Sequence, residues 1–385
     1  MSTSLAIVMV HQGAELYGSD RSFVSALCAL RERHPHATID VVLPEPGPIV
    51  DHVARYASRI LYNGYGVLRK KELKARPWQT CRRMIAAWLD YRRMFRSYQI
   101  CYVNTVVCVA AIAALRGQRA GTYVHVREIP SSFALKIFRG LLKTSRASLI
   151  YNSWATAEAF ALPGDVIHNG VDIVTPVAPA DPTQNRTRRL AIIGRINPWK
   201  GQQFFLDALS TLGRRLPVQV RIVGDVFPGY EELLETLRET AKRCAQTVEI
   251  EGFTNDPAAH FAWADFVVVP SVLPEPFGRV AIESFAAGRP VIASDAGGLR
   301  EIVTDGVTGL LFAPGDAQNL VRILQRAVAL IPEEYCAMAE AAHRAYEHRF
   351  TIRSYMDAIA DQIGTRRVQQ PAQPQPNPQS AGRSR

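Results

Sequence analysis

The stretch Val269-Pro-Ser-Val-Leu-Pro-Glu-Pro-Phe-Gly-Arg-Val-Ala-Ile-Glu283 places two carboxylates, Glu275 and Glu283, eight positions apart. The apolar run that ends at Val269 predicts a buried strand, and Gly278 followed by residues 279–287 predicts a helix. Glu275 therefore belongs to a proline-flanked loop at the carboxyl end of a strand, and Glu283 to the second turn of the helix. Exposed backbone N–H groups at such a helix N-terminus favour a diphosphate.

Short apolar runs rich in valine and isoleucine recur in both halves of the chain, with longer mixed stretches between them. Runs of this kind, without alternation, are typical of strands buried on both faces of a parallel sheet. They are Leu5–Val10, Ile39–Leu43, Ile100–Val103, Thr122–Val126, Leu149–Tyr151, Leu190–Ile193, Val218–Val223, Val248–Glu251, Phe266–Val269, Pro290–Ala293 and Gly309–Phe312. With helices between the runs, they predict an α/β protein of two Rossmann-like, doubly wound sheets.

The domain boundaries follow from composition. Residues 173–189 are proline-rich and poor in large apolar side chains, which predicts a linker between domains 1–172 and 190–349. We expect a helix around residues 350–365 to complete the first domain. Two facing sheets make a cleft lined by the carboxyl ends of their strands, where ligands of α/β sheets bind. Residues 366–385, rich in proline and glutamine, predict a disordered tail.

The segment around the two glutamates resembles the E-x7-E motif of retaining glycosyltransferases of family 4, which have the GT-B fold. The resemblance implies that Glu275 orients hydroxyls of the transferred sugar and that Glu283 binds the nucleotide ribose. It also adds Phe277 and Gly278 to the donor-binding residues. The alternative interpretation is a loop glutamate followed by a helix that carries one solvated glutamate.

A second segment, Ile193-Gly-Arg-Ile-Asn-Pro-Trp-Lys-Gly201, follows the first strand of the second domain. It resembles the Gly-Arg…Lys-Gly loop of the same family, whose two cations clamp the donor diphosphate. A leaving diphosphate gains negative charge as the glycosidic bond breaks, and Arg195 and Lys200 can stabilise that charge without a metal. We therefore predict that both are catalytic and donor-binding; two ordinary surface cations are the alternative.

Three glycine-containing segments extend the resemblance. Residues 221–225 and 251–253 resemble strand ends that line the nucleobase pocket, which makes Gly224 and Phe253 candidate donor-binding residues. These signals are weaker, because glycine turns after strands occur in many α/β proteins. Residues 294–302 include Gly297 and Gly298, which permit close backbone approach near the sugar.

The first half of the chain resembles the family less closely. After the first strand, Gln12 replaces the first glycine of the family's N-terminal loop, and the amide of Gly13 could approach the donor phosphate. Ser19 or Asp20 could equally cap the following helix. His125 ends a predicted strand, as does the family histidine near the transferred sugar, so we predict a catalytic role; a structural histidine is the alternative. In Asn169-Gly170 we predict a turn that shapes the hinge.

Charge and composition bound the remaining possibilities. The 385 residues have a net charge of +10, and the six cysteines are too scattered for a disulfide framework or a zinc site. The sequence indicates neither a metal nor a cofactor. The N-terminal apolar run is too short for a signal peptide, and the longest apolar stretch, Val106–Leu115, is about half a membrane span. We expect a cytoplasmic protein with reduced cysteines.

Much of the positive charge lies in residues 68–98, and a weaker basic stretch follows at 132–146. Both combine arginine and lysine with aromatic and aliphatic side chains at helical spacing. Helices of this kind bind anionic membrane surfaces. One interpretation is therefore that the protein binds the inner face of the cell membrane. Equally, their apolar faces could pack on the sheet and leave the cations solvated. No nucleic-acid-binding motif accompanies them, so we expect no nucleic acid partner.

Together these features favour a retaining glycosyltransferase that transfers a sugar from a UDP- or GDP-sugar to a glycan or lipid-linked acceptor. Assembly of cell-envelope polysaccharide or glycolipid is the expected setting. A non-catalytic nucleotide-sugar-binding or membrane-associated protein of the same fold is one alternative. An epimerase is another. A phosphorylase would need a lysine site for pyridoxal phosphate, and the sequence contains no such motif.

Overall fold

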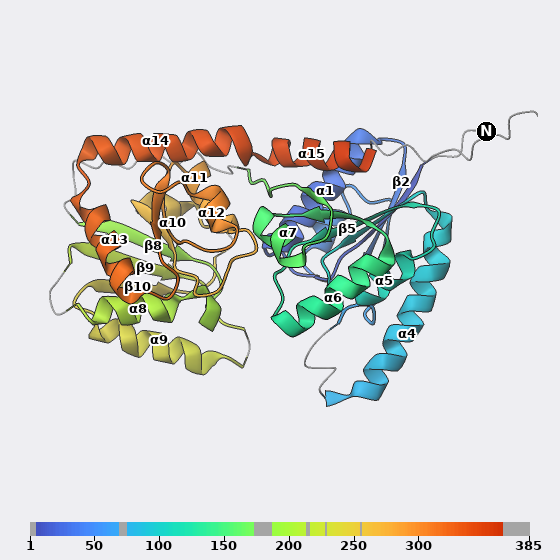
Figure 1. The fold of residues 1–385 in the computed structure, drawn as a ribbon, viewed down its shortest axis with the longest axis horizontal. Helices are drawn as coiled ribbons and strands as arrows, with labels where there is room; N and C mark the ends of the chain where they lie inside the picture. The colour runs from blue at the N-terminus through green and yellow to red at the C-terminus, as the bar shows by residue number, and fades with distance from the viewer. Residues whose placement is uncertain are drawn as a thin grey trace, which may run out of the picture.

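The computed structural model describes residues 5–68, 75–172, 187–212, 216–227, 229–254 and 256–364. Two parallel sheets, each covered by helices on both faces, lie side by side (Figure 1). This arrangement confirms the predicted α/β architecture of two Rossmann-like sheets. Residues 173–186 of the predicted linker and the predicted tail 366–385 lie outside the described residues, as do residues 69–74 of the first basic stretch.

The first sheet has seven strands in the order β3-β2-β1-β4-β5-β6-β7, all parallel. Its strands are β1 (Ala6–Val10), β2 (Thr38–Leu43), β3 (Arg59–Tyr62), β4 (Ile100–Asn104), β5 (Gly121–Val126), β6 (Ser148–Tyr151) and β7 (Asp165–Val166). Among the described residues, the helices of this half are α1 (Gly18–Arg33), α2 (Val50–Val53), α4 (Pro77–Met94), the 3-10 turn η1 (Phe95–Ser97), α5 (Val109–Leu115), α6 (Ser132–Ser145) and α7 (Trp154–Phe160).

The second sheet has six parallel strands in the order β10-β9-β8-β11-β12-β13. They are β8 (Arg188–Ile193), β9 (Val218–Val223), β10 (Thr247–Glu251), β11 (Phe266–Val269), β12 (Val291–Ser294) and β13 (Gly309–Phe312). The helical elements are η2 (Pro198–Lys200), α8 (Gln202–Ser210), α9 (Glu231–Arg243), α10 (Ala258–Trp263), α11 (Arg279–Ala286), α12 (Leu299–Ile302), α13 (Ala317–Ala329), α14 (Pro332–Arg349) and α15 (Ile352–Gly364).

Each sheet has a buried apolar cluster on either face, as expected for strands without alternation. In the first domain, one cluster joins β1 and β2 to α1 and α15, and the other joins β4 and β5 to α4, α5 and α6. The strand order reverses between β1 and β4 and again between β8 and β11. Ligands of doubly wound sheets bind at the carboxyl ends of the strands beside such a reversal.

The chain returns from the second domain to the first near its end. α14 lies along the second domain and α15 continues onto the first, where it packs against α1 (Figure 1). Between the two helices, Thr351 pairs with Val171, whose N–H donates to the carbonyl oxygen of Phe350 at 2.9 Å. A Cβ on the neighbouring Gly170 would collide with the Thr351 carbonyl oxygen. The two chain segments that connect the domains therefore touch each other.

Candidate functional site

Lys200 and Glu275 form an ion pair at the carboxyl ends of the second sheet. Lys200 Nζ donates to Glu275 Oε1 at 2.5 Å, and Ser271 Oγ donates to the same oxygen at 2.6 Å. Lys200 follows β8 through the turn η2, whereas Ser271 and Glu275 follow β11. Only 4% of the Glu275 side chain is exposed, so these two partners replace water around the carboxylate. Two residues predicted from separate segments thus meet beside the strand reversal.

The backbone around Glu275 is held by the loop after β12. Glu275 pairs with Gly297, and the N–H of Gly298 donates to the carbonyl oxygen of Glu275 at 2.8 Å. Gly297 has a φ of +59°, and a Cβ on it would collide with that carbonyl oxygen. The close approach that these glycines were predicted to permit is therefore an approach to the glutamate loop itself.

Arg195 lies between two aromatic rings from different domains. Its guanidinium carbon is 4.0 Å from the centre of the Tyr17 ring and 3.6 Å from that of Phe227. Tyr17 comes from the loop before α1, and Phe227 from the loop after β9. The ring of Phe253 lies edge-on to Tyr17 at 6.0 Å and is exposed. Stacking on rings holds a guanidinium without neutralising its charge.

Gly224 lies where the ends of β8 and β9 meet. It has a φ of +154°, and a Cβ on it would collide with the carbonyl oxygen of Gly194, immediately before Arg195. The N–H of Ile196 donates to the carbonyl oxygen of Asp225 at 2.9 Å. Gly224 therefore lets the two strand ends approach each other, which fixes the direction of the Arg195 loop.

Glu283 faces Arg279 one helical turn earlier. Arg279 Nε donates to Glu283 Oε1 at 2.8 Å, and Arg279 Nη1 donates to Ser22 Oγ of α1 at 3.3 Å. Gly278, with a φ of +106°, precedes the helix as predicted from the sequence. A quarter of the Glu283 side chain is exposed.

Phe277 and Gly13 lie in more crowded places than a donor-binding role suggests. The Phe277 ring is 3% exposed and packs against His168 and Phe350, between the domains. A Cβ on Gly13 would come within 2.5 Å of Asp20 Oδ1, so the loop after β1 is pressed onto that carboxylate. Neither residue presents an exposed side chain, and contact with a donor would come from the backbone.

His125 is fully buried at the end of β5. Its Nδ1 lies 2.7 Å from the hydroxyl of Tyr102 and 3.2 Å from Arg127 Nη2. Since both neighbours are donors, Nδ1 is the acceptor and the proton lies on Nε2, which has no partner among the described residues. Burial and the charge of Arg127 hold the pKa of His125 well below its usual value, so the ring is neutral at pH 7.

Arg127 follows β5, and the sequence assigned no role to it. It connects the end of β5 with β4, with the segment after β7 and with α15. It donates to Asn104 at 2.7 Å, to Asn169 at 2.6 Å and to the Tyr355 hydroxyl of α15 at 2.7 Å. Asn104 in turn donates to His11 Nδ1, and His11 Nε2 donates to Asp20 at 2.7 Å. Asp20 is thus part of a buried network and also accepts from the N–H of Tyr17.

Sequence reasoning missed the residues that join the domains at α7. Glu301 of α12 accepts hydrogen bonds from the N–H groups of Trp154 and Ala155 and from His168 Nε2. Ser153, just before α7, donates to the carbonyl oxygen of Pro276, next to Glu275, at 2.5 Å. Glu301 and Pro276 stood in segments singled out by the family resemblance, but only the fold reveals that they meet the start of α7.

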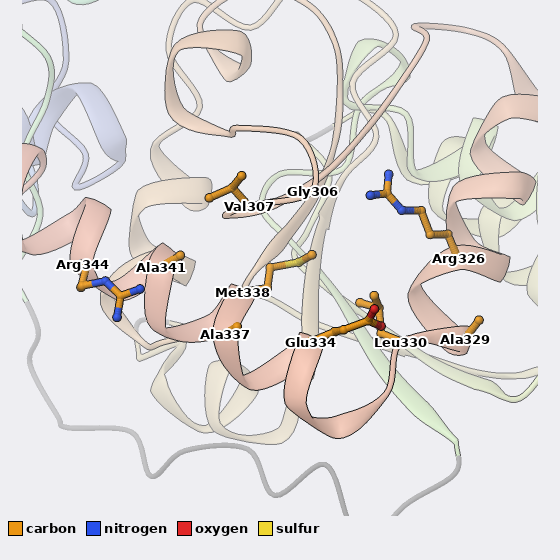
Figure 2. Close-up of a pocket in the computed structure, with 10 residues that line it drawn as sticks. All are labelled: Gly306, Val307, Arg326, Ala329, Leu330, Glu334, Ala337, Met338, Ala341 and Arg344. Carbon is orange, nitrogen blue, oxygen red and sulfur yellow. The ribbon is translucent and has the colours of Figure 1, made fainter.

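A pocket of 620 Å³ lies elsewhere, between α13, α14 and the turn after α12 (Figure 2). Arg326, Glu334 and Met338 are among its lining residues. None of the predicted donor-binding residues lines it. We therefore do not assign it to the predicted site.

Comparison with known sequences finds a family match in the second domain. Residues 187–329 match the family described as Glycosyl transferases group 1. A lipopolysaccharide 1,2-N-acetylglucosaminetransferase of Salmonella typhimurium is 29% identical over 209 residues, 52% of either chain. A phosphatidyl-myo-inositol mannosyltransferase of Mycobacterium tuberculosis is 30% identical over 238 residues, 56% of this chain and 61% of the relative. The matched region thus spans only about half the length of these curated relatives.

Comparison with solved structures covers the whole architecture. Anabaena HepE in complex with UDP superimposes with a TM-score of 0.76 over 94% of this chain and all of the other, at 24% identity. The lipopolysaccharide outer core galactosyltransferase WaaB gives a TM-score of 0.71 at 16% identity, over 93% of this chain and 99% of the other. The fold is GT-B.

Proposed function

We propose that the protein is a retaining glycosyltransferase that uses a nucleoside diphosphate sugar, UDP- or GDP-linked, without a metal ion. The acceptor is a glycan or a lipid-linked saccharide, and the product belongs to cell-envelope polysaccharide or glycolipid synthesis. The observation that carries the proposal is the ion pair of Lys200 with the buried Glu275 beside the strand reversal, with Arg195 on the neighbouring turn.

The charges of these residues suit a diphosphate sugar. Arg195 is stacked between two aromatic rings, and Lys200 is paired with the Glu275 carboxylate. The two positive charges of Arg195 and Lys200 are therefore only half balanced by the one negative charge of Glu275. A donor diphosphate would supply the missing negative charge. Glu275, once it shares Lys200 with the diphosphate, can accept hydrogen bonds from sugar hydroxyls. Glu283 offers a carboxylate oxygen to the ribose diol.

The transfer step follows from this arrangement. The bond between the anomeric carbon and the diphosphate oxygen breaks, and Arg195 and Lys200 stabilise the charge that develops on that oxygen. The acceptor hydroxyl forms its bond to the anomeric carbon on the same face. Its proton passes to the leaving phosphate oxygen, so no protein nucleophile is required. His125, neutral and with its Nε2 proton unused within the described residues, would donate to a sugar hydroxyl.

An anionic membrane surface is the proposed location of the acceptor. Trp78 at the start of α4 is 84% exposed and Phe133 in the first turn of α6 is 77% exposed. Arg82, Arg83 and Lys136 lie exposed near them. Exposed aromatic side chains among cations suit the boundary between lipid headgroups and acyl chains. None of the helices in the described part of the chain is long and apolar enough to cross a membrane. We propose a cytoplasmic protein that binds the inner face of the cell membrane peripherally.

The test is thermal unfolding of the full chain with UDP, GDP, ADP and their sugars, in parallel with Glu283→Ala. A ligand at about 100 times its Kd adds roughly 2.7 kcal/mol of stability. We expect one nucleotide to raise the melting temperature of the wild type, and we expect Glu283→Ala to lose that shift. The matched control is Glu340→Ala, a substitution of an exposed glutamate on α14, which should keep the shift.

The alternatives give different outcomes. If no nucleotide shifts the melting temperature, the donor site is wrong. A non-catalytic binding protein would show the shift but would not consume the donor with any acceptor. Incubation of the donor alone, followed by analysis of the sugar, distinguishes an epimerase, because only an epimerase would isomerise it.

A further inference from the structure

Glu301 joins the two domains by charge-assisted hydrogen bonds. Its Oε2 accepts from the Trp154 N–H at 2.8 Å and from His168 Nε2 at 2.9 Å, and its Oε1 accepts from the Ala155 N–H at 2.7 Å. Trp154 and Ala155 begin α7 in the first domain, whereas Glu301 lies in α12 of the second. Only 13% of the Glu301 side chain is exposed, so water screens these bonds little.

The same turn of the first domain binds the loop that contains Glu275. Ser153 Oγ donates to the carbonyl oxygen of Pro276 at 2.5 Å, and Thr156 Oγ1 lies 3.1 Å from that oxygen. The Ser153 and Thr156 side chains are buried. Pro276 directly follows Glu275 in the chain, so the first turn of α7 lies one residue from the glutamate paired with Lys200. α7 and α12 face each other between the two domains in Figure 1.

Three links therefore form a continuous path. Glu301 binds the backbone of α7, the residues at the start of α7 bind Pro276, and the loop of Gly297 and Gly298, which begins α12, binds Glu275. A shift of α12 away from α7 would act on the Glu275 loop from both ends. The contact lies beside the crossing at Val171 and Thr351, because His168 precedes Val171 by three residues and its ring packs near Phe350.

We propose that Glu301 is a positioning residue, which clamps the second domain to the start of α7 and thereby fixes the loop that presents Glu275 to the sugar. Glu301 itself touches no substrate. The proposal rests on the proposed function for its consequence in transfer, but its structural part concerns the protein alone.

Hydrogen exchange in the full chain tests the structural part without a substrate. We compare Glu301→Gln, which removes the charge but keeps the size, with Glu340→Gln as the matched control. We expect the amides of Glu275, Phe277 and Gly278 to exchange about ten- to a hundredfold faster in Glu301→Gln, through a local opening that precedes exchange of the strands of both sheets. Ser153→Ala, which leaves the bonds of Glu301 to α7 intact, should accelerate the same three amides. The proposal is overturned if these three amides exchange at the wild-type rate in both variants.

A binding and rate measurement tests the catalytic consequence. With the nucleoside diphosphate found by thermal unfolding as probe, Glu301→Gln should bind it as tightly as the wild type, because Arg195, Lys200 and Glu283 are unaffected. The kcat of transfer should fall by about tenfold or more. A loss of nucleotide affinity equal to the loss in kcat would contradict a positioning role. If no nucleotide binds even the wild type, the proposed function fails, and the exchange experiment still decides the role of Glu301.

Discussion

Gly297 illustrates how a single residue can control the site without touching a ligand. Its positive φ of +59° and the absence of a Cβ allow the Glu275 carbonyl to lie against it. The two residues lie 22 positions apart, and the sequence predicted close backbone approach near the sugar without naming a protein partner. The observed neighbour is protein backbone, which no motif spacing could have indicated.

Gly297→Ala should therefore lower stability and activity together. The left-handed φ and the collision with Glu275 should lower the free energy of unfolding by about 2–4 kcal/mol, and transfer should be lost because the Glu275 loop moves. Chemical denaturation and a transfer assay measure the two effects.

Gly315→Ala is the matched control for that substitution. Gly315 has a similar φ of +73°, but a Cβ there would meet nothing within 4 Å. It should cost only about 1 kcal/mol and keep activity. Equal losses in the two variants would show that φ alone matters and that the contact with Glu275 does not.

At the scale of elements, α4 divides into two parts. Tyr91 is buried near its end, whereas Ile85 and Trp78 nearer its start are exposed. The sequence left two alternatives open, a packed apolar face or a membrane-facing one. In the structure, Ala87 and Tyr91 of the second half are buried, whereas Trp78 and Ile85 stay exposed among the described residues. α5 packs against both α4 and α6, which places the exposed aromatic side chains on one side of the first domain.

Vesicle binding should depend on these uncovered side chains. Trp78→Ser and Phe133→Ser should each weaken binding to vesicles that contain phosphatidylglycerol by about tenfold, with little change in stability, since both side chains are exposed. Flotation of the protein with vesicles measures this. Val307→Ser, a substitution of an exposed aliphatic residue in the second domain, is the control. Equal binding by all three variants and the wild type would contradict membrane contact at α4 and α6.

Most elements were predictable because their signal is local. Eleven apolar runs predicted eleven strands, each at nearly the observed position, since strands buried on both faces are continuously apolar. β3 and β7 escaped prediction for a physical reason. β3 is an edge strand whose first and last residues are exposed, and β7 has only two residues, so neither requires an apolar run.

At the scale of the whole molecule, sequence predicted that the loops of Lys200 and Glu275 follow strands of the second sheet, but not how the domains meet. The Lys200–Glu275 pair follows from two loops beside one strand reversal, and this geometry is general for such sheets. The contacts of Glu301 with α7 and of Tyr17 with Arg195 depend on the relative position of two separately folded sheets. Nothing in the local sequence encodes that position.

The contact between the domains should respond to acid. Burial alone raises the pKa of Glu301, but hydrogen bonds from His168, Ala155 and Trp154 bring it below the usual 4.5. A lowered pKa means that the carboxylate stabilises the folded protein above pH 4.5 and that this contribution is lost as the pH falls further. His168 is the titratable side chain bonded to it, and Arg349 donates to its carbonyl oxygen.

Glu301→Gln should thus be less stable than the wild type by about 1–3 kcal/mol near neutral pH, and the difference should shrink below pH 4.5. Thermal unfolding over a pH series measures it. If the difference in unfolding free energy between the two proteins stays constant down to the lowest pH at which they fold, the charge of Glu301 contributes nothing to stability.

The packing of α15 on α1 has a consequence for synthesis. A ribosome adds about 5–20 residues per second, so roughly 15–60 seconds separate the emergence of α1 from that of α15. During this interval the apolar face of α1 that Tyr355 and Ile359 will cover is open to other proteins. The first domain begins to fold first but acquires its last helix only after the second domain has been made. A chaperone that covers exposed apolar surface would therefore bind the N-terminal half of the nascent chain.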